Sequence, residues 1–562
     1  MKKFLFFSLT LFVCMTSVNS QDFSFTVSGG QTLYFNINGN NAVITQPQDT
    51  SLPYFTQLGD LVIPSMVTNE NEDYLVSAID SFAFANCRGL TSITIPSSIV
   101  SIGKSAFNGA SDMVRTYYLG SIDQWCNISF VSGQSNPVYL TGNLYINNTL
   151  VTSPVISEGV QEIRPFCFAG MRSLTNISLP SSLSLIGKYA FCYCVNLSTI
   201  SLPIALRTIE EDAFYHCDGL RNVILPDYLE FLGDRAFRYC GLETITIPSK
   251  VKYIGENAFV HNESLVNVIF NADSCLVMGK KRDDGNIYCV FGSGCTSLGT
   301  ITIGKNVKVI PDYAFAFCRY VSEIVIPDGV ERIGHAAFQT CSSLEKITLG
   351  RSVRNIPDST FGWCLGLQNI TLRSEVPPTV GINTFHLISP IVSVPCSAVE
   401  TYAEHIYWRQ FSIEGAFEYD VQISTSDSNM GSVEFLVNPS CSTNVAVVKA
   451  NANSGYVFYQ WSDGNMDNPR VIEVCSDTSF VATFVSQEGI DNEIENGYSI
   501  VVHNNAIVID GASNNHVRVF DVLGRSIANM WCPSNRLCIK VPSAGLYLVQ
   551  IETLPPSKVV VR

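Results

Sequence analysis

Apolar and polar positions repeat with a fixed period along residues 160–261. In each repeat an Ile is followed at set spacings by Phe, Cys, Leu and Ile, and then by a Leu-Pro or Ile-Pro pair. The Phe falls at positions 168, 191, 214, 237 and 259, so the steps are 23, 23, 23 and 22 residues. A repeat of this length cannot bury its own apolar face and must stack on its neighbours. The pattern therefore predicts a solenoid that is mainly β.

Two segments of each repeat have different periodicities. The end of the repeat alternates apolar and polar residues, as in Ile200-Ser201-Leu202, which predicts a short strand that Pro203 ends. The Ala-Phe-x-x-Cys segment has apolar residues at helical spacing and predicts a single helical turn on the opposite side. A glycine often follows the second Ile, where we expect a corner with positive φ. These glycines are Gly103, Gly187, Gly233, Gly255 and Gly334.

The outward residues of the predicted strands form a candidate binding face. Most are Thr or Ser, with a few aliphatic residues among them. A surface of this kind is suited to a large partner, because small ligands prefer concave and mostly apolar pockets. The alternative, that Thr is present only because it favours strands, stays open. The face comprises Thr94, Ser178, Ser201, Ile224, Thr246, Ile269, Thr302, Val325, Thr348 and Thr371.

The Ala-Phe-x-x-Cys-x-x-Leu motif, found again around Phe84, Phe107, Phe315, Phe338 and Phe361, resembles the BspA-like leucine-rich repeat over residues 75–385. The stretches 111–153 and 271–290 interrupt its rhythm. Residues 21–74, with strands expected at 23–27 and 33–37, and residues 386–416, with a short helix expected at 401–411, are predicted to cap the solenoid. The resemblance implies an adhesin, a surface protein that binds host matrix proteins such as fibronectin and fibrinogen, or other microbial cells.

Residues 417–486 change to two-residue alternation and are expected to form a separate small β domain. The stretches Gly455-Tyr456-x-Phe458 and Trp461-Ser462-Asp463-Gly464 resemble the internalin B-repeat family. That resemblance implies a β-grasp-like module that serves as a spacer or adhesive unit. Residues 487–497 are acidic and polar, which is typical of a linker.

Residues 498–562 contain four apolar strand patterns separated by Gly, Asn and Pro turns, which predict a small antiparallel β-sandwich. The stretches 519–525, 542–549 and 558–562 resemble the type A C-terminal sorting domain of type IX secretion cargo. The resemblance implies a Gram-negative source of the Bacteroidota type, recognition by the type IX secretion machinery, export across the outer membrane and removal of this domain. The expected sorting residues are Gly524, Arg525, Gly545, Tyr547, Lys558 and Arg562. The family's Tyr-Pro-Asn-Pro opening is absent, which leaves the processing position open.

Residues 1–20 have the features of a secretory signal peptide. Lys2 and Lys3 precede an apolar run, and a small-residue site favours cleavage between Ser20 and Gln21. No later stretch offers the roughly 18 apolar residues that a membrane span needs. The sequence therefore predicts a protein located at the cell surface or outside the cell, with no membrane span.

The net charge of the chain excludes one class of partner. Lys and Arg number 34 against 49 Asp and Glu, which gives a net charge of −15. An acidic chain of this kind is not expected to bind nucleic acid.

Seven cysteines occupy one repeat position, and stacked coils bring such residues close enough for disulfide bonds. The same position holds Ala110, Met171 and Asn262 in other repeats, which favours buried free thiols. Cys441 and Cys475 lie outside this series and could bridge the module at 417–486. The full set of candidate disulfide cysteines is Cys441, Cys475, Cys532 and Cys538.

No residue constellation indicates catalysis. The seven His residues form no His-Glu-x-x-His motif, and no Gly-x-Ser-x-Gly motif is present. His216, His261 and His335 are expected on the surface. The sequence thus predicts no enzyme, no catalytic residues, no cofactor and no metal site. A second hypothesis is a surface glycan- or peptide-capture component of an uptake system, with Tyr117, Tyr118 and Trp125 as candidate aromatic platforms.

Overall fold

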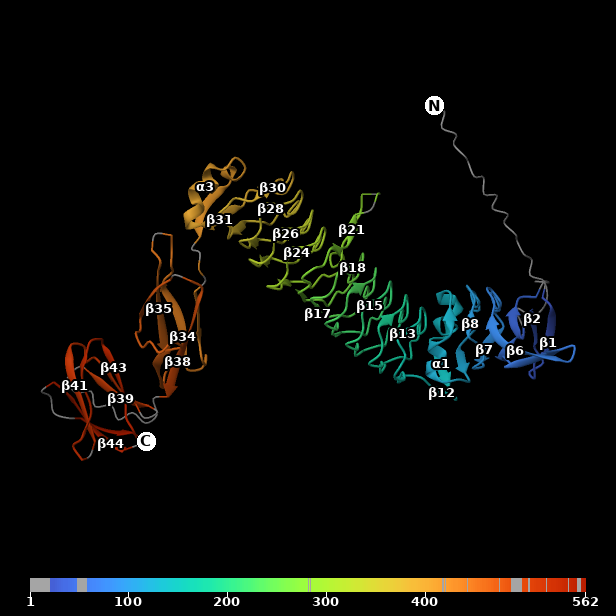
Figure 1. The fold of residues 1–562 in the computed structure, drawn as a ribbon, viewed down its shortest axis with the longest axis horizontal. Coiled ribbons are helices and arrows are strands. Elements are labelled where there is room, and N and C mark those ends of the chain that lie inside the picture. The colour runs from blue at the N-terminus through green and yellow to red at the C-terminus, as the bar shows by residue number, and fades with distance from the viewer. Residues whose placement is uncertain are drawn as a thin grey trace, which may run out of the picture. The chain divides into compact units, whose positions relative to one another are not determined.

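The computed structural model forms two compact units, residues 1–394 with 398–414 and residues 395–397 with 415–562 (Figure 1). The predicted signal peptide, the predicted linker, Cys475 and Arg562 lie outside the described residues. The structure describes residues 21–47, 58–281, 283, 285–416, 419, 421–441, 443–474, 476–486, 498–503, 506–521, 523–543, 545–552 and 557–561.

The solenoid begins with an antiparallel meander. The strands expected at 23–27 and 33–37 are present as β1 (Phe23–Thr26) and β2 (Thr32–Asn38), followed by β3 (Asn41–Thr45). β3 then pairs in parallel with β6 (Glu72–Ile79), so the meander continues directly into the sheet of the first coils. The other strands of these first two sheets are β4 (Gly59–Val62), β5 (Met66–Asn69), β7 (Leu90–Ile95), β8 (Ser101–Ile102), β9 (Arg115–Tyr118), β10 (Ser129–Phe130), β11 (Leu144–Ile146) and β12 (Thr149–Leu150).

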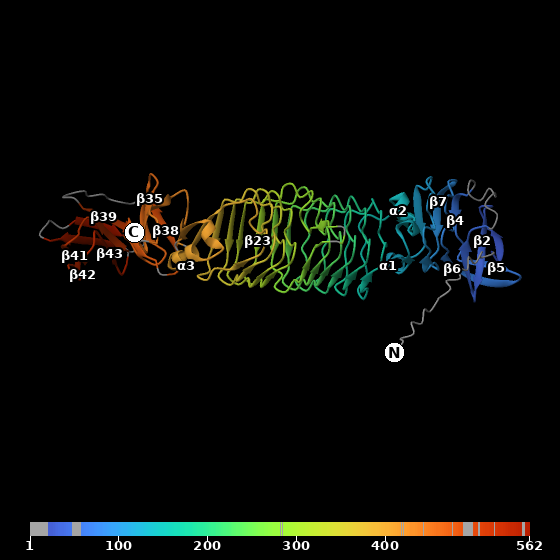
Figure 2. The same ribbon diagram turned by 90° about the horizontal axis from the view of Figure 1, so that it is seen from above.

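The regular coils lie side by side in a row and carry two parallel strand ladders (Figure 2). The registers follow the sequence period, since Leu185 pairs with Thr208 and Thr208 with Phe231. The first ladder has the predicted Ile-x-Ile-Pro strands: β17 (Thr244–Ile247), β19 (Asn267–Phe270), β23 (Thr300–Ile303), β25 (Glu323–Ile326), β27 (Lys346–Leu349) and β29 (Asn369–Leu372). The second has two-residue strands: β13 (Glu162–Ile163), β14 (Leu185–Ile186), β15 (Thr208–Ile209), β16 (Phe231–Leu232), β18 (Tyr253–Ile254), β20 (Val277–Met278), β24 (Val309–Ile310), β26 (Arg332–Ile333), β28 (Asn355–Ile356) and β30 (Thr379–Val380).

The core is a continuous stack of phenylalanine rings, one from each coil. Neighbouring rings are parallel within 15° and their centroids lie 4.9 to 6.1 Å apart from Phe168 to Phe385. Phe214, for example, lies between Phe191 at 5.1 Å and Phe237 at 4.9 Å. Because each ring packs on the rings of both neighbouring coils, no coil has a complete core alone.

The Ala-Phe-x-x-Cys segment, here called the turn segment, does not form the predicted helical turn. In residues 189–194, Tyr189 and Tyr193 have positive φ values of 57° and 60°. The backbone N–H groups of Tyr189, Phe191 and Tyr193 donate to the next coil, to the carbonyls of Glu211, Ala213 and Tyr215. The left-handed conformation costs about 1–2 kcal/mol for a side-chain-bearing residue, and we attribute its stability to these inter-coil hydrogen bonds. The segment is therefore a third ladder.

The corner glycines are explained by close approach and not by positive φ. Gly233 and Gly334 are both outside the positive-φ region. A Cβ atom at Gly233 would collide with the backbone of Glu211, and one at Gly334 with the backbone of Asp312. The expectation of a positive φ at these corners is thus wrong, and glycine is required because neighbouring coils touch there.

Both interruptions are built into the row of coils. The first contains α1 (Ile122–Cys126), the 3₁₀ turn η2 (Gly133–Ser135) and α2 (Val138–Thr141), and its Trp125 belongs to the solenoid core. The second contains a two-stranded hairpin of β21 (Lys280–Lys281) and β22 (Ile287–Tyr288).

The far end of the solenoid is closed by a buried aromatic pair. α3 (Val399–Glu404) and η4 (Trp408–Gln410) correspond to the helix expected at 401–411. The Tyr402 hydroxyl donates to the carbonyl of Ser374 at 2.8 Å, and the Trp408 indole N–H donates to that of Pro378 at 2.9 Å. Two further strands extend the first ladder at this edge, β31 (Ile391–Pro395) and β32 (Ser412–Ala416). The 3₁₀ turn η3 (Cys396–Ala398) follows β31 directly.

The described residues of the second unit form four small sheets. Residues 421–486 form two of them, from β33 (Val421–Thr425), β38 (Thr478–Ser486) and β36 (Tyr456–Trp461), and from β34 (Gly431–Val437), β35 (Val445–Ala452) and β37 (Arg470–Glu473). The described residues of this module contain no helix, so the β-grasp-like expectation is not confirmed. Residues 498–561 form two antiparallel sheets around one core, from β39 (Ser499–His503), β40 (Ala506–Asp510) and β43 (Arg536–Lys540), and from β42 (Ser526–Cys532), β41 (Asn515–Asp521), β44 (Gly545–Ile551) and β45 (Ser557–Val561).

Candidate binding surfaces

The predicted strand residues form a surface on the first ladder, here called the strand face. All ten side chains are half-buried or exposed, and Ile224 is the most accessible aliphatic one, with an exposed fraction of 85%. Thr246, Ile269 and Thr302 lie in register on neighbouring strands. The three residues Val325, Thr348 and Thr371 form a second such row. Ser178, Ser201 and Ile224 lie in coils that have no regular strand at this position, and Thr94 lies apart on β7.

The aromatic residues considered for glycan capture are not all accessible. Trp125 is fully buried, and its indole N–H donates to the carbonyl of Cys167 at 3.0 Å. Tyr118 is also buried, and burial raises the pKa of its hydroxyl to about 12. Both belong to the core, so the expectation of exposed platforms is wrong for them. Tyr117 instead packs against Tyr145 in a tilted arrangement, at 5.1 Å between ring centroids, beside a cavity of about 400 Å³ that reaches Thr94.

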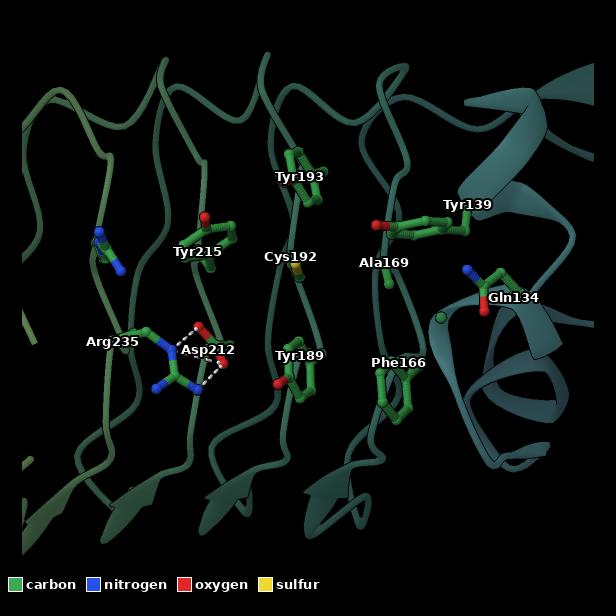
Figure 3. Close-up of a pocket in the computed structure, with 12 residues that line it drawn as sticks. Gln134, Tyr139, Phe166, Ala169, Tyr189, Cys192, Tyr193, Asp212, Tyr215 and Arg235 are labelled. Carbon is green, nitrogen blue, oxygen red and sulfur yellow. Dashed lines mark hydrogen bonds and ion pairs between the residues drawn. The ribbon is translucent and has the colours of Figure 1, made fainter. Parts of the chain in front are cut away.

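A second cavity, here called the trough, lies on the outer side of the turn segments, which we call the turn face (Figure 3). Its volume is about 370 Å³. Ala169 and Cys192 form its floor, Phe166 and Tyr189 lie along one side, and Tyr193 lies along the other. Tyr139, from α2 of the first interruption, borders one end together with Gln134.

An ion pair lies at the other end of the trough. The Arg235 guanidinium donates to both carboxylate oxygens of Asp212, at 2.9 Å from Nε and 2.7 Å from a terminal nitrogen, and also to Glu211. The Asp212 side chain is almost fully buried. Hydrogen bonding to Asp212 is the main cause that raises the pKa of Arg235. This arrangement fixes both side chains and leaves the guanidinium charged at every physiological pH.

The tyrosine hydroxyls around the trough stay protonated near neutral pH. Burial is the main cause that raises the pKa of Tyr139, Tyr193 and Tyr215, and it raises that of Tyr189 to about 12 with the help of Asp212. Neutral phenols can both donate and accept hydrogen bonds. The trough therefore combines aromatic walls with a hydroxyl-bearing rim.

A stack of four rings continues from the wall of the trough. Tyr193, His216, Tyr239 and His261 are parallel within 8°, with centroid distances of 4.9, 4.3 and 4.3 Å. His216 and His261 were expected on the surface, and the structure places them half-buried in this stack. Burial and nearby Arg238 lower the pKa of His261. These rings are the turn-face equivalent of the phenylalanine stack in the core.

The sequence did not reveal the turn face, because the helical spacing of Ala190, Phe191 and Cys194 predicts a helical turn. A left-handed conformation at Tyr189 and Tyr193 leaves no such periodic signal. A usable signal was present in the repeat alignment, where Ala169 and Cys192 are followed 23 residues later by Tyr215 and then Arg238. Small side chains in two coils next to large ones in the following coils indicate a hollow.

The repeat cysteines are free and buried, with a specific hydrogen bond. The thiol of Cys194 donates to the carbonyl of Phe168 at 3.1 Å, and that of Cys217 to the carbonyl of Phe191 at 3.2 Å. Asn262, in the same slot, donates to the carbonyls of Phe237 and Phe259. The slot is therefore a donor site for a buried carbonyl and not only a packing position.

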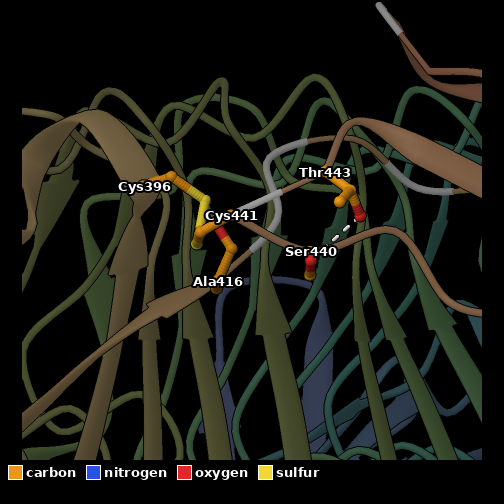
Figure 4. The surroundings of a disulfide bond; sticks show 5 residues. All are labelled: Cys396, Ala416, Ser440, Cys441 and Thr443. Carbon is orange, nitrogen blue, oxygen red and sulfur yellow. Dashed lines mark hydrogen bonds between the residues drawn. A yellow bond between two sulfur atoms is a disulfide. The ribbon is translucent and has the colours of Figure 1, made fainter.

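Cys441 is bonded to Cys396 and not to Cys475 (Figure 4). The Cα atoms of Cys396 and Cys441 are 5.3 Å apart, which suits a disulfide. Cys532 and Cys538 are free. Cys532 lies in the core of its module, whereas Cys538 alternates with the core residue Ile539, so these two thiols do not share a face. Of the candidate disulfide cysteines, Cys441 is therefore bonded to Cys396, and Cys532 and Cys538 form no disulfide.

The predicted sorting residues lie on the antiparallel sheets of the last module. Gly524 has a φ of 78° in the turn after β41, where the Arg525 guanidinium contacts Asp521 at 2.7 Å. Tyr547 is buried, and its hydroxyl donates to the Ser543 carbonyl at 2.7 Å. Gly545 and Lys558 lie on the paired strands β44 and β45. The predicted signal cleavage lies between Ser20 and Gln21. Gln21 is the first residue that the structure describes, and Ser20 lies outside the described residues.

No helix in the described part of the chain is long and apolar enough to cross a membrane. No group of three or more His, Cys, Asp or Glu side chains there could hold a metal ion.

Short strands, corner glycines and a ring stack repeated every 23 residues define a leucine-rich-repeat solenoid. The family model described as the BspA type leucine rich repeat region matches six copies, over residues 67–148, 138–266 and 288–412, which is more than half of the 562 residues. The chain belongs to this BspA-type leucine-rich repeat family. A second model, a domain of unknown function named DUF6383, matches residues 485–561.

Several solved structures are similar to the chain. A leucine-rich repeat protein from Bacteroides ovatus is 23% identical over 68% of this chain and 98% of its own, with a TM-score of 0.46. A leucine rich cell surface protein from Faecalibacterium prausnitzii is 24% identical over 70% and 95%, with a TM-score of 0.38. The pneumococcal vaccine antigen PcpA is 15% identical over 71% and 100%, with a TM-score of 0.36. No curated protein matches the chain.

Proposed function

We propose that this protein is an exported binding scaffold, an adhesin, that engages an extracellular protein or a microbial surface through its strand face. The observation that carries the proposal is the in-register row Thr246, Ile269 and Thr302, continued by Val325, Thr348 and Thr371. The six side chains point away from the core on strands that are about 4.8 Å apart. Hydroxyl groups and isolated aliphatic side chains on a regular sheet suit a broad, flat partner.

The first experiment measures binding of the chain from Gln21 onward to immobilised fibronectin, fibrinogen and intact bacteria over a series of salt concentrations. A Thr246→Arg/Thr302→Arg double variant places two large charges on the strand face, and we expect it to abolish saturable binding. The matched control is Thr208→Arg, because Thr208 is half-buried on β15 of the other ladder. If the folded chain binds none of these partners, or if both variants bind equally well, the strand-face proposal is wrong.

Export is part of the same proposal. Residues 1–20 would direct the chain out of the cytoplasm, and residues 498–562 would serve as the sorting domain for type IX secretion. Its support is the motif pattern, together with the buried Tyr547 and the tight turn at Gly524. Deletion of residues 558–562 is expected to retain the protein in the periplasm, as measured by cell fractionation and surface proteolysis. Surface display of the deletion variant at the normal level would contradict the assignment.

Glycan capture is the second candidate function. The trough on the turn face favours it, because aromatic walls and neutral hydroxyls surround a cavity of a size that fits a small ligand.

A further inference from the structure

The trough is bounded along the row of coils. Its floor is Ala169 in one coil and Cys192 in the next, and the same position holds the large residues Tyr215 and Arg238 in the following two coils. Tyr139 borders the opposite end. Two coil spacings of about 4.8 Å give the floor a length of about 10 Å. The trough is thus a short hollow, open on its outer side, for a compact ligand and not a continuous groove.

The backbone around the trough is already satisfied. The N–H groups of Phe166, Tyr189 and Tyr193 donate to the carbonyls of Lys188, Glu211 and Tyr215 in the next coil. An extended peptide is usually held by main-chain hydrogen bonds along an open strand edge. These N–H groups are not available to an extended peptide, so a ligand in the trough meets mainly side chains.

Those side chains suit a ligand with several hydroxyl groups. Four phenols, of Tyr139, Tyr189, Tyr193 and Tyr215, line the cavity within two or three coils. Each can donate one hydrogen bond and accept others. Their rings supply apolar surface between the polar tips, which matches the alternation of C–H and O–H groups on a sugar.

The charge of the trough is suited to an anion. The Asp212 carboxylate is neutralised by Arg235. The Arg238 guanidinium lies over the Tyr239 ring, 5.0 Å from its centroid, and forms no ion pair with any described residue. Its buried Nε has no hydrogen-bond partner among the described residues. Phe166 and Tyr189 stack face to face, with their centroids 4.9 Å apart.

We propose that the trough binds a carboxylated pyranose, a uronic acid or a sialic acid, with the carboxylate on Arg238 and the hydroxyls on the tyrosine phenols. This inference gives the chain a small-ligand site on the turn face, separate from the strand face, and it does not depend on the adhesin proposal. A charge-assisted pair with a guanidinium supplies the selectivity for the acid over neutral sugars.

The test is isothermal titration calorimetry of the chain from Gln21 onward with glucuronic acid, galacturonic acid and N-acetylneuraminic acid. Glucose and galactose are the neutral counterparts. We expect at least one acid to bind, and its neutral counterpart to bind about tenfold to a hundredfold more weakly, because one charge-assisted contact is missing. The acid that binds shows whether the ligand is a uronic acid or a sialic acid.

Two variants test whether the acid binds in the trough. Arg238→Gln removes the charge, and we expect it to reduce acid affinity to that of the neutral sugar. Cys192→Tyr fills the floor with the residue that the next coil carries at Tyr215, so we expect the fold to tolerate it and the cavity to be lost. Arg319→Gln is the matched control, because Arg319 lies over Phe317 at 5.7 Å on the same face, remote from the trough.

Loss of binding in Arg238→Gln and Cys192→Tyr, with normal binding in Arg319→Gln and unchanged circular dichroism in all three, supports the proposal. Absence of binding by the wild-type chain overturns it, as does equal affinity for acidic and neutral sugars. Binding of acidic peptides in place of sugars also overturns it. None of these results depends on whether the strand face binds a protein.

Discussion

The strand face and the turn face share one period, but their outward side chains are placed by different backbone geometry. On the strand face, Thr246 points outward because residues alternate along a pleated strand. On the turn face, Tyr189 and Tyr193 point outward because left-handed residues flank the buried Phe191. The first rule is local and leaves flat rows of small side chains. The second depends on hydrogen bonds to the next coil and builds stacked rings with a cavity between them.

Removing a core ring should damage both faces at once and gives the largest expected effect. Phe214→Ala removes a fully buried ring that packs on Phe191 and Phe237, and we expect a loss of about 3–5 kcal/mol in unfolding free energy. Urea denaturation followed by circular dichroism measures it. The control is Ile224→Ala, which truncates an exposed strand-face residue. Equal losses in the two variants would mean that the ring stack does not hold the coils together.

The hydrogen bonds beneath the turn segments should be the next most sensitive feature. Asn262→Leu keeps the volume of the buried side chain but removes the side-chain donor to the carbonyl of Phe237 and the acceptor of the Leu242 N–H, at an expected cost of about 3 kcal/mol. Asn262→Cys restores the donor that other coils use and should cost clearly less. Urea midpoints of the two variants provide the comparison, and a larger loss for Cys than for Leu would contradict the donor role.

High pH should destabilise the turn side of the coils through the thiols. Burial raises the pKa of Cys87, Cys192 and Cys295 from 9.0 to about 12. The neutral thiols therefore contribute their full stability below about pH 9, and it is lost as the pH rises toward the folded pKa. Each thiol should cost about 1.4 kcal/mol per pH unit in that window.

Urea denaturation between pH 8 and pH 10, with a reducing agent present, tests this expectation. Cys87→Ala is the matched variant, because Ala110 occupies the same slot in the next coil, and its stability should fall less steeply with pH. A wild-type stability that stays constant to pH 10 would contradict the prediction.

The strand face should tolerate substitution best. Thr246→Ala removes an exposed hydroxyl and methyl group, and we expect a change within about 0.5 kcal/mol in unfolding free energy. The same urea assay applies, with Phe214→Ala as the reference for a large effect. A loss above 1 kcal/mol would show that this face is structural and would weaken its role as a binding surface.

The sequence was sufficient for the solenoid, its register and the strand face. The 23-residue step from Ile186 to Ile209 is the register observed between β14 and β15. It was not sufficient for the turn segments, because a positive φ at a residue such as Tyr189 is locally unfavourable and exists only through bonds to the next coil. The trough also needs Tyr139, which the first interruption carries to the side of Tyr193. No periodic pattern encodes that placement.

The sequence located the corner glycines, but positive φ is the wrong explanation for them. A positive φ is a property of one residue, whereas the collision that a Cβ at Gly233 would cause involves the backbone of Glu211 in the neighbouring coil. The free buried thiols followed from the substitution of Ala110 and Met171 at the same slot. The bond of Cys396 to Cys441 joins residues 45 positions apart, and no repeat relates them.

The aromatic closure at Tyr402 and Trp408 determines where growth of the solenoid stops. A row of parallel coils has an open edge at each end, and an open edge of backbone N–H and C=O groups can add a strand from another molecule. Here the indole of Trp408 and the hydroxyl of Tyr402 occupy the carbonyls of Pro378 and Ser374. A fragment that ends after β29 would also lose β31, the strand that pairs with β29, and we expect it to self-associate through that exposed edge.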